Sequence, residues 1–174
     1  KQAMEEVESD SGALKRRTGV RIHWLPGGEE QMTDTTVERR EEEALFAAIS
    51  AVVQPADEVI VFEPAYDAYV PVVELNGGIP VFLELKFPEY RIDWNQVAHA
   101  ITPRTRLMVL NFPHNPTGAV FSSEDMRALR EVTRGTDVLI LSDEVYEHIV
   151  FDGYRHESMA RDPELAARSF VVSS

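Results

Sequence analysis

Continuous apolar runs alternate with helical patterns along most of this chain, and this alternation is the strongest constraint on its fold. The runs are rich in Val, Ile and Leu, and they occupy residues 58–62, 79–85, 106–111, 137–141 and 170–172. Strands of this composition are typical of a sheet that is covered on both faces. Regular alternation of strands with helices favours parallel pairing. The sequence therefore predicts an α/β fold with a three-layer, mostly parallel sheet and flanking helices.

Turn and capping residues delimit the helices that we expect between these strands. One helical pattern begins near residue 37 and ends before Pro55, and a second, over 67–76, ends at two glycines. Asp93 begins a short helix through residue 101, because its carboxylate accepts the free amide hydrogens of a first turn. Ser122 or Ser123 is expected to cap a fourth helix over 124–134.

Most of the first 43 residues follow neither pattern. They are polar except for a short apolar patch at 20–25, which a Pro-Gly-Gly turn ends. We therefore expect an N-terminal arm over 1–43, with one short strand or helical turn, and a separate domain over 44–174.

Composition excludes several classes of function. The 174 residues contain 17 Lys and Arg against 30 Asp and Glu, a net charge of −13 that disfavours nucleic acid and anionic membranes as partners. The absence of cysteine excludes disulfides, thiolate zinc sites and a thiol nucleophile. No apolar run approaches the roughly 18 to 20 residues that span a bilayer, and no signal peptide is visible. These features predict a cytoplasmic protein.

Ligands of parallel sheets bind beyond the carboxyl ends of the strands, so the loops found there are the candidate sites. Tyr66 follows the strand at 58–62, where an aromatic ring either stacks on a flat ligand or packs locally. Asn115 lies in a loop with two prolines and a glycine, which hold its amide on a rigid support. Its neighbour His114 is a candidate base, although a single loop histidine is more typically solvated.

Asp143 follows the strand at 137–141 and is therefore expected to be partly buried and to need a donor or a cation. Tyr146, three residues later, is placed to share its side. Glu144, Glu147 and His148 resemble metal ligands, but no second cluster completes a site, so we expect no metal.

Two of these loops together resemble a known family. Asn115-Pro116-Thr117-Gly118 after a strand, and then Ser142-Asp143-Glu144-Val145-Tyr146, are similar to motifs in the large domain of class I/II aminotransferases, which depend on pyridoxal 5′-phosphate. The resemblance covers about residues 44–174. Its details are most similar to the methionine, aromatic and kynurenine aminotransferase subgroup, and carbon–sulfur lyases share much of it.

The resemblance implies a role for each loop residue. Asp143 matches the carboxylate that pairs with the protonated pyridine nitrogen of the cofactor, and Tyr146 and Asn115 match the donors to its phenolate oxygen. Tyr66 matches the aromatic that stacks on the ring, and Ser174 matches a serine that holds the phosphate. The family also implies α-amino acid and 2-oxo acid substrates and a homodimer.

Two departures from the family limit this prediction. The family's Schiff-base lysine would follow Ser174, and none of the lysines present, at positions 1, 15 and 86, stands in its context. Glu41 and Glu42 replace the small residues of the family's phosphate cradle, where carboxylates repel a phosphate. We therefore expect an inactive fragment of an aminotransferase with weak or absent cofactor binding. The alternatives are a non-catalytic binding or assembly module with this fold and a fragment of a carbon–sulfur lyase.

Overall fold

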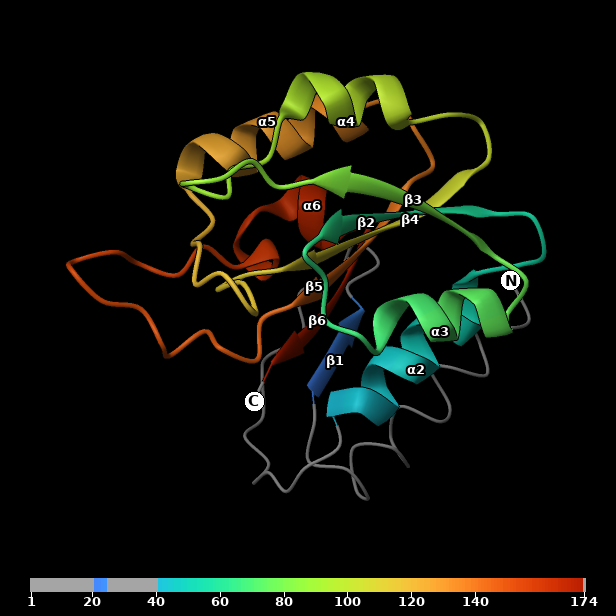
Figure 1. Ribbon diagram of the computed structural model, residues 1–174, viewed down its shortest axis with the longest axis horizontal. Helices are drawn as coiled ribbons and strands as arrows, with labels where there is room; N and C mark the ends of the chain where they lie inside the picture. The colour runs from blue at the N-terminus through green and yellow to red at the C-terminus, as the bar shows by residue number, and fades with distance from the viewer. Residues whose placement is uncertain (1–20, 25–40, 174) are drawn as a thin grey trace.

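The computed structural model describes residues 21–24 and 41–173, and its centre is one six-stranded sheet (Figure 1). The strand order is β1-β6-β5-β4-β2-β3. Strands β2 to β6 pair in parallel, and β1 pairs antiparallel with β6 at one edge. The predicted mostly parallel α/β sheet is therefore confirmed. The strands are β1 Arg21–Trp24, β2 Glu58–Glu63, β3 Ile79–Glu84, β4 Thr105–Asn111, β5 Leu139–Asp143 and β6 Ser169–Ser173.

Helices cover both faces of this sheet and make three layers (Figure 1). One face carries α2 and α3, whose apolar residues form a core with the sheet around Ile49, Val73 and Leu107. The opposite face carries α4 and α5, with a second core around Val97, Leu129 and Ile140. The helices are α2 Glu41–Val52, α3 Tyr69–Leu75, α4 Trp94–Ala100, α5 Ser123–Thr133 and the short α6 Pro163–Ala166. Among the described residues, no helix has the length and apolar content needed to cross a membrane.

The predicted caps explain where the helices begin and end. The Asp93 carboxylate accepts the amide hydrogens of Asn95 and Gln96 at the start of α4. Ser122, one of the two serines predicted, caps α5 and forms a reciprocal capping box with Asp125. Gly77 follows α3 with φ +76, a conformation that glycine adopts at little cost. These elements are local in origin, which is why sequence patterns identify them.

Two features differ from the sequence expectations or add to them, and one expected element is found near the N-terminus. Strand β5 begins and ends two residues later than predicted, because Asp143 still pairs with Asn111 of β4 and Val172 of β6. The 3₁₀ turn η1, Met159–Arg161, and α6 were not predicted. The short strand expected within residues 20–25 is present as β1, and the rest of the predicted arm before residue 41 lies outside the described residues.

Candidate functional site

Asp143 lies at the carboxyl end of β5 with a 3% exposed surface, and its carboxylate accepts bonds from Tyr69 and Val145, both among the described residues. The hydroxyl of Tyr69, the first residue of α3, donates to Oδ2 at 2.5 Å, and the backbone amide of Val145 donates to Oδ1 at 3.3 Å. Such donors offset the cost of removing a carboxylate from water. Burial, with the Asp143 charge next to it, raises the pKa of Tyr69 far above its usual range. The phenol therefore stays protonated and remains a donor.

Asn111 joins the end of β4 to its neighbours. Its side-chain amide donates to the backbone carbonyl of Asp143 at 3.2 Å, and its side-chain oxygen accepts from the amide hydrogen of Asn115 at 2.8 Å. Asn111 is buried, so these bonds are shielded from water. A polar residue at the end of an apolar strand was the available sequence signal for this role, and the prediction missed it.

The loop that contains Asn115 is closed by two backbone bonds between its ends. The amide of Gly118 donates to the carbonyl of His114, and the amide of His114 donates to the carbonyl of Ala119, both at 2.8 Å. The Asn115 side chain is half-buried and makes no hydrogen bond within residues 21–24 and 41–173. Its amide is therefore available to a ligand on a well-held support.

His114 is buried, so the expectation of a solvated histidine was wrong. Only 5% of its surface is exposed, and its Nδ1 lies 2.8 Å from the Thr117 hydroxyl. Burial disfavours the imidazolium and lowers the pKa of His114 to about 4. The imidazole is neutral at pH 7 and bonds within its own loop, which favours a structural role over that of a base.

Acidification is expected to destabilise the fold through His114. The unfolded chain binds a proton near pH 6.5 and the folded chain only near pH 4, so stability is full above pH 6.5 and falls as the pH drops towards 4. The slope from one proton is at most about 1.4 kcal/mol per pH unit. Urea unfolding from pH 7 to pH 4 measures it, and His114→Gln should flatten the slope. The exposed His148→Gln is the control, and an equal slope in all three chains would contradict the assignment.

Tyr66 lies between α3 and the start of α2. Its hydroxyl donates to Glu42 Oε1 at 2.9 Å, and this bond raises the pKa of Tyr66 to about 12. Its ring meets the Tyr69 ring edge-on, with centroids 5.6 Å apart and planes at 80°. Glu42 therefore engages the aromatic residue predicted to stack on the cofactor.

Tyr146 lies just beyond β5 and is 38% exposed. Its hydroxyl makes no hydrogen bond in the described parts of the chain, and it is near enough to Tyr66 and Tyr69 to influence the ionisation of both phenols. The structure thus gathers Tyr66, Asp143 and Tyr146 around Tyr69, and Asn111 connects Asn115 to the same strand ends. Ser174, the fifth predicted residue, lies outside the described residues.

Glu144 points into a separate polar cluster. With 1% exposed surface, its carboxylate accepts from the Ser142 hydroxyl at 2.8 Å and the Met159 amide at 3.0 Å, and it lies 2.8 Å from His156 Nε2. One potential metal-ligand atom from each of Glu144, Glu147 and His156 lies within 4.8 Å of the other two. The histidine of this cluster is thus His156 and not the predicted His148, which is exposed. The hydrogen bonds of Glu144 account for the cluster as a structural element.

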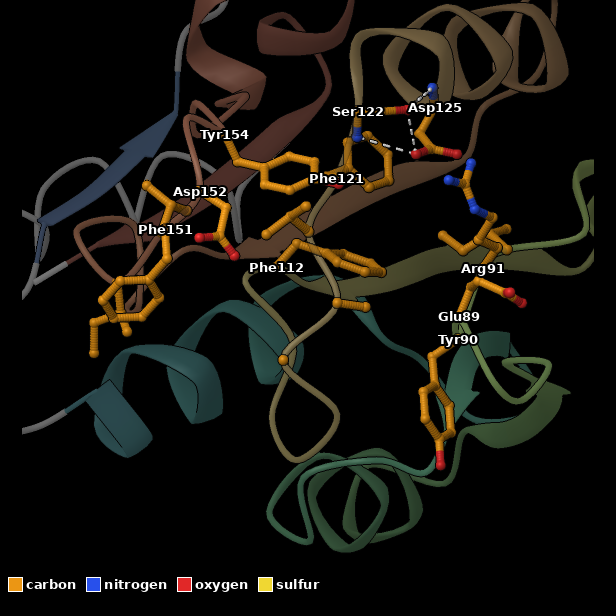
Figure 2. Close-up of a pocket in the computed structure, with 16 residues that line it drawn as sticks. Glu89, Tyr90, Arg91, Phe112, Phe121, Ser122, Asp125, Phe151, Asp152 and Tyr154 are labelled. Atoms are coloured by element: carbon orange, nitrogen blue, oxygen red, sulfur yellow. Dashed lines mark hydrogen bonds between the residues drawn. The ribbon is translucent and has the colours of Figure 1, made fainter.

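A pocket of about 370 Å³ lies beside these strand ends, on the side of Phe112 (Figure 2). Figure 2 shows Phe112, Phe121 and Tyr154 on its walls, with Arg91 and Asp152 at opposite sides. Of the predicted cofactor-binding residues that the structure describes, none lines it: Tyr66, Asn115, Asp143 and Tyr146 all lie elsewhere. It is therefore a hollow distinct from the polar site around Asp143.

Comparison with known proteins identifies the family. The family model described as aminotransferase class I and II matches residues 42–173. This chain belongs to the class I and II aminotransferases. The resemblance inferred from the two loop motifs is confirmed, and the cofactor of this family is pyridoxal 5′-phosphate, as predicted.

Several aminotransferases are similar to this family member. Methionine aminotransferase from Escherichia coli is 44% identical over 171 residues, which are 98% of this chain and 44% of that protein. Kynurenine–oxoglutarate transaminase 1 from Mus musculus is 38% identical over 142 residues, 75% of this chain and 34% of that protein. The chain therefore spans less than half the length of these relatives.

Solved aminotransferase structures share the fold. An Escherichia coli protein with a methionine aminotransferase function superposes with a TM-score of 0.77 at 35% identity, over 99% of this chain and 43% of that one. N-succinyldiaminopimelate aminotransferase from Mycobacterium tuberculosis gives 0.75 at 32% identity, over 96% and 42%.

Proposed function

We propose that this chain is the cofactor-binding part of an aminotransferase that moves an amino group from an α-amino acid to a 2-oxo acid. The observation that carries the proposal is the buried Asp143 carboxylate at the end of β5, with the Asn115 amide and the Tyr146 hydroxyl in the adjoining loops. When bound, pyridoxal phosphate supplies an electron sink for the carbanion left when the substrate α-proton departs. The names of the relatives support transamination over a binding module or a carbon–sulfur lyase.

The residues present fit this cofactor. Asp143 is an acceptor for a protonated ring nitrogen, and a bond between opposite charges in a buried place is strong and directional. Asn115 and Tyr146 have side-chain donors with no partner among the described residues, and these suit the phenolate oxygen. Tyr66 supplies an aromatic face beside them. The chain's contribution is thus to hold the ring in place and to keep its nitrogen protonated.

Lys86 does not supply a Schiff-base amine. It is the one lysine in the described residues, and its ammonium pairs with Asp93 at 3.0 Å in an exposed position. We therefore propose that the 174-residue chain binds the cofactor weakly and does not turn over. A transamination assay with added pyridoxal phosphate tests the second part, because any turnover by the purified chain contradicts it.

A titration with pyridoxal phosphate, followed by absorbance, tests the binding. The expected result is weak, saturable binding, and borohydride should trap no specific covalent adduct because Lys86, the one lysine in the described residues, is paired with Asp93. The absence of saturable binding would overturn the proposal in favour of a non-catalytic module with this fold. For the whole protein we propose a homodimer in the cytoplasm, which sedimentation and fractionation would test.

Replacing Glu42 with glutamine is expected to tighten this binding. Glu42 lies in the first turn of α2, where free amides favour a phosphate but a carboxylate repels it. Since Glu42 is exposed, screening reduces the gain to about 1 kcal/mol, or roughly fivefold in affinity. The pKa of Tyr66, now about 12, should fall towards 10. Glu74→Gln, an exposed change of the same charge on α3, is the matched control, and equal effects of both variants would refute the placement.

A further inference from the structure

We propose that Tyr69 is a positioning residue for the cofactor, which orients the Asp143 carboxylate towards the ring nitrogen. The inference rests on the proposed function and adds a residue that neither the strand-end pattern nor the family motifs singled out. It follows from three features of the structure: the bond to Asp143, the burial of both partners, and the contact of Tyr69 with Tyr66.

The bond joins two elements that are far apart in the sequence. Tyr69 begins α3 and Asp143 ends β5, and the hydroxyl reaches Oδ2 at 2.5 Å. Both residues are 3% exposed, so water does not compete for this bond. With Val145 donating to Oδ1, each carboxylate oxygen has a fixed donor, and rotation of the group would break both bonds. Each carboxylate oxygen has two lone pairs, so a bond from the Tyr69 hydroxyl is compatible with a bond from a ligand to the same group.

The contact with Tyr66 means that Tyr69 also helps to fix the plane of the Tyr66 ring, which is predicted to stack on the cofactor. The two tyrosine rings meet edge-on at 5.6 Å, and the Tyr69 amide donates to the Tyr66 carbonyl at 3.4 Å. The turn from Tyr66 to Tyr69 thus positions the aromatic face of Tyr66. Through the Tyr69 hydroxyl it also positions the carboxylate of Asp143. A group held within about half an ångström of its productive position binds a ligand without further ordering cost.

A purely structural role for Tyr69 predicts a different response to mutation. Tyr69 also packs in the core with Val73 and Leu141, and loss of packing would weaken every ligand equally. A positioning role acts through Asp143, so it matters only for ligands whose ring nitrogen is protonated. The two roles are separated by comparing pyridoxal phosphate with its 1-deaza analogue, in which a carbon replaces the ring nitrogen.

The experiment measures both ligands with the unaltered chain, Tyr69→Phe and the exposed control Tyr154→Phe. Tyr69→Phe should weaken pyridoxal phosphate binding about tenfold, leave the binding of the deaza analogue unchanged, and move the ring-nitrogen ¹⁵N signal towards that of neutral pyridine. Tyr154→Phe should change nothing. Equal losses for both ligands, or no loss, would overturn the inference while the proposed function stands. No binding by the unaltered chain would overturn both.

A measurement on the unaltered chain covers the case in which Tyr69→Phe does not fold. The Tyr69 hydroxyl proton should give a downfield NMR signal that shifts when pyridoxal phosphate is added and stays in place with the deaza analogue. Disappearance of the signal on addition of pyridoxal phosphate would show that the hydroxyl leaves Asp143, which would contradict the inference.

Discussion

An Asp143→Ala variant is expected to lose pyridoxal phosphate binding by about a hundredfold, which is roughly 2.7 kcal/mol. The carboxylate is buried, and a charged acceptor in such a place contributes several times more to affinity than an exposed one. The loss should be equally visible by absorbance titration and by equilibrium dialysis. It is one of the two largest effects that we expect from a single substitution in this chain.

A second variant, compared with Asp143→Ala, separates the charge from the shape of this residue. Asp143→Asn keeps an oxygen for the Tyr69 hydroxyl but removes the charge, so its affinity should fall nearly as far while the fold is preserved. Asp143→Ala also leaves that hydroxyl unpaired in the core, which costs about 1–3 kcal/mol of stability. Asp137→Ala, at an exposed position before β5, is the matched control. Wild-type affinity in Asp143→Asn would show that charge pairing does not hold the cofactor.

The neighbouring Glu144→Ala variant is expected to show its effect in stability. Its carboxylate satisfies the buried Ser142 hydroxyl and Met159 amide and bonds to His156. Each donor left without an acceptor costs about 1–3 kcal/mol, so the free energy of unfolding should fall by about 3 kcal/mol or more. Urea unfolding at pH 7 measures the change, because the midpoint should drop with little change in slope.

Glu147→Ala provides the comparison for this cluster. Its side chain is partly exposed and lies 3.9 Å from the exposed His148, so its removal should change stability by less than about 0.5 kcal/mol. Glu144→Gln retains one side-chain oxygen, so its loss in the free energy of unfolding should lie between those of Glu144→Ala and Glu147→Ala. If Glu144→Ala were as stable as Glu147→Ala, the contacts of Glu144 would not be holding η1 against the sheet.

Adjacent acids thus have separate tasks because successive side chains of an extended backbone point to opposite sides, and Glu144 directly follows the last residue of β5. The Asp143 side chain points towards Tyr69, and the Glu144 side chain points towards the segment from His156 to Met159. The motif resemblance separated Asp143 from Glu144, and the direction of the two side chains supplies the physical reason.

The elements that sequence predicted well are those whose causes are local. Asp93, Ser122 and Gly77 act on residues within a few positions, and the strands are marked by their own apolar runs. The predicted positions of Asp143 and Tyr146 followed from strand ends and from motif resemblance. Their roles towards the cofactor remain predictions that the variants above test.

The missed features depend on distant partners. Tyr69 acts through a residue 74 positions away, so no local pattern shows its role. Asn111 has a local signal as a polar residue at a strand end, but its partner lies 32 positions away. His114 is buried, and besides the adjacent Phe112 ring its imidazole bonds to the backbone of Pro64, 50 positions earlier in the chain. The elements η1 and α6 have three and four residues, too few for a periodic signal, and Ser158 and Asp162 cap them.

Strand β1 has a consequence for the order in which this sheet is assembled. It pairs Trp24 with Phe170 and Arg21 with Ser173, so this edge joins segments that are about 150 residues apart in the chain. Closing so long a loop costs more entropy than pairing β2 with β3, and we therefore expect the β1–β6 edge to form late and to open early. Since β6 also pairs with Asp143 through Val172, opening of that edge reaches the strand that carries the site. Asp143 is thus connected, through β6, to the strand pairing that joins the segments farthest apart in the sequence.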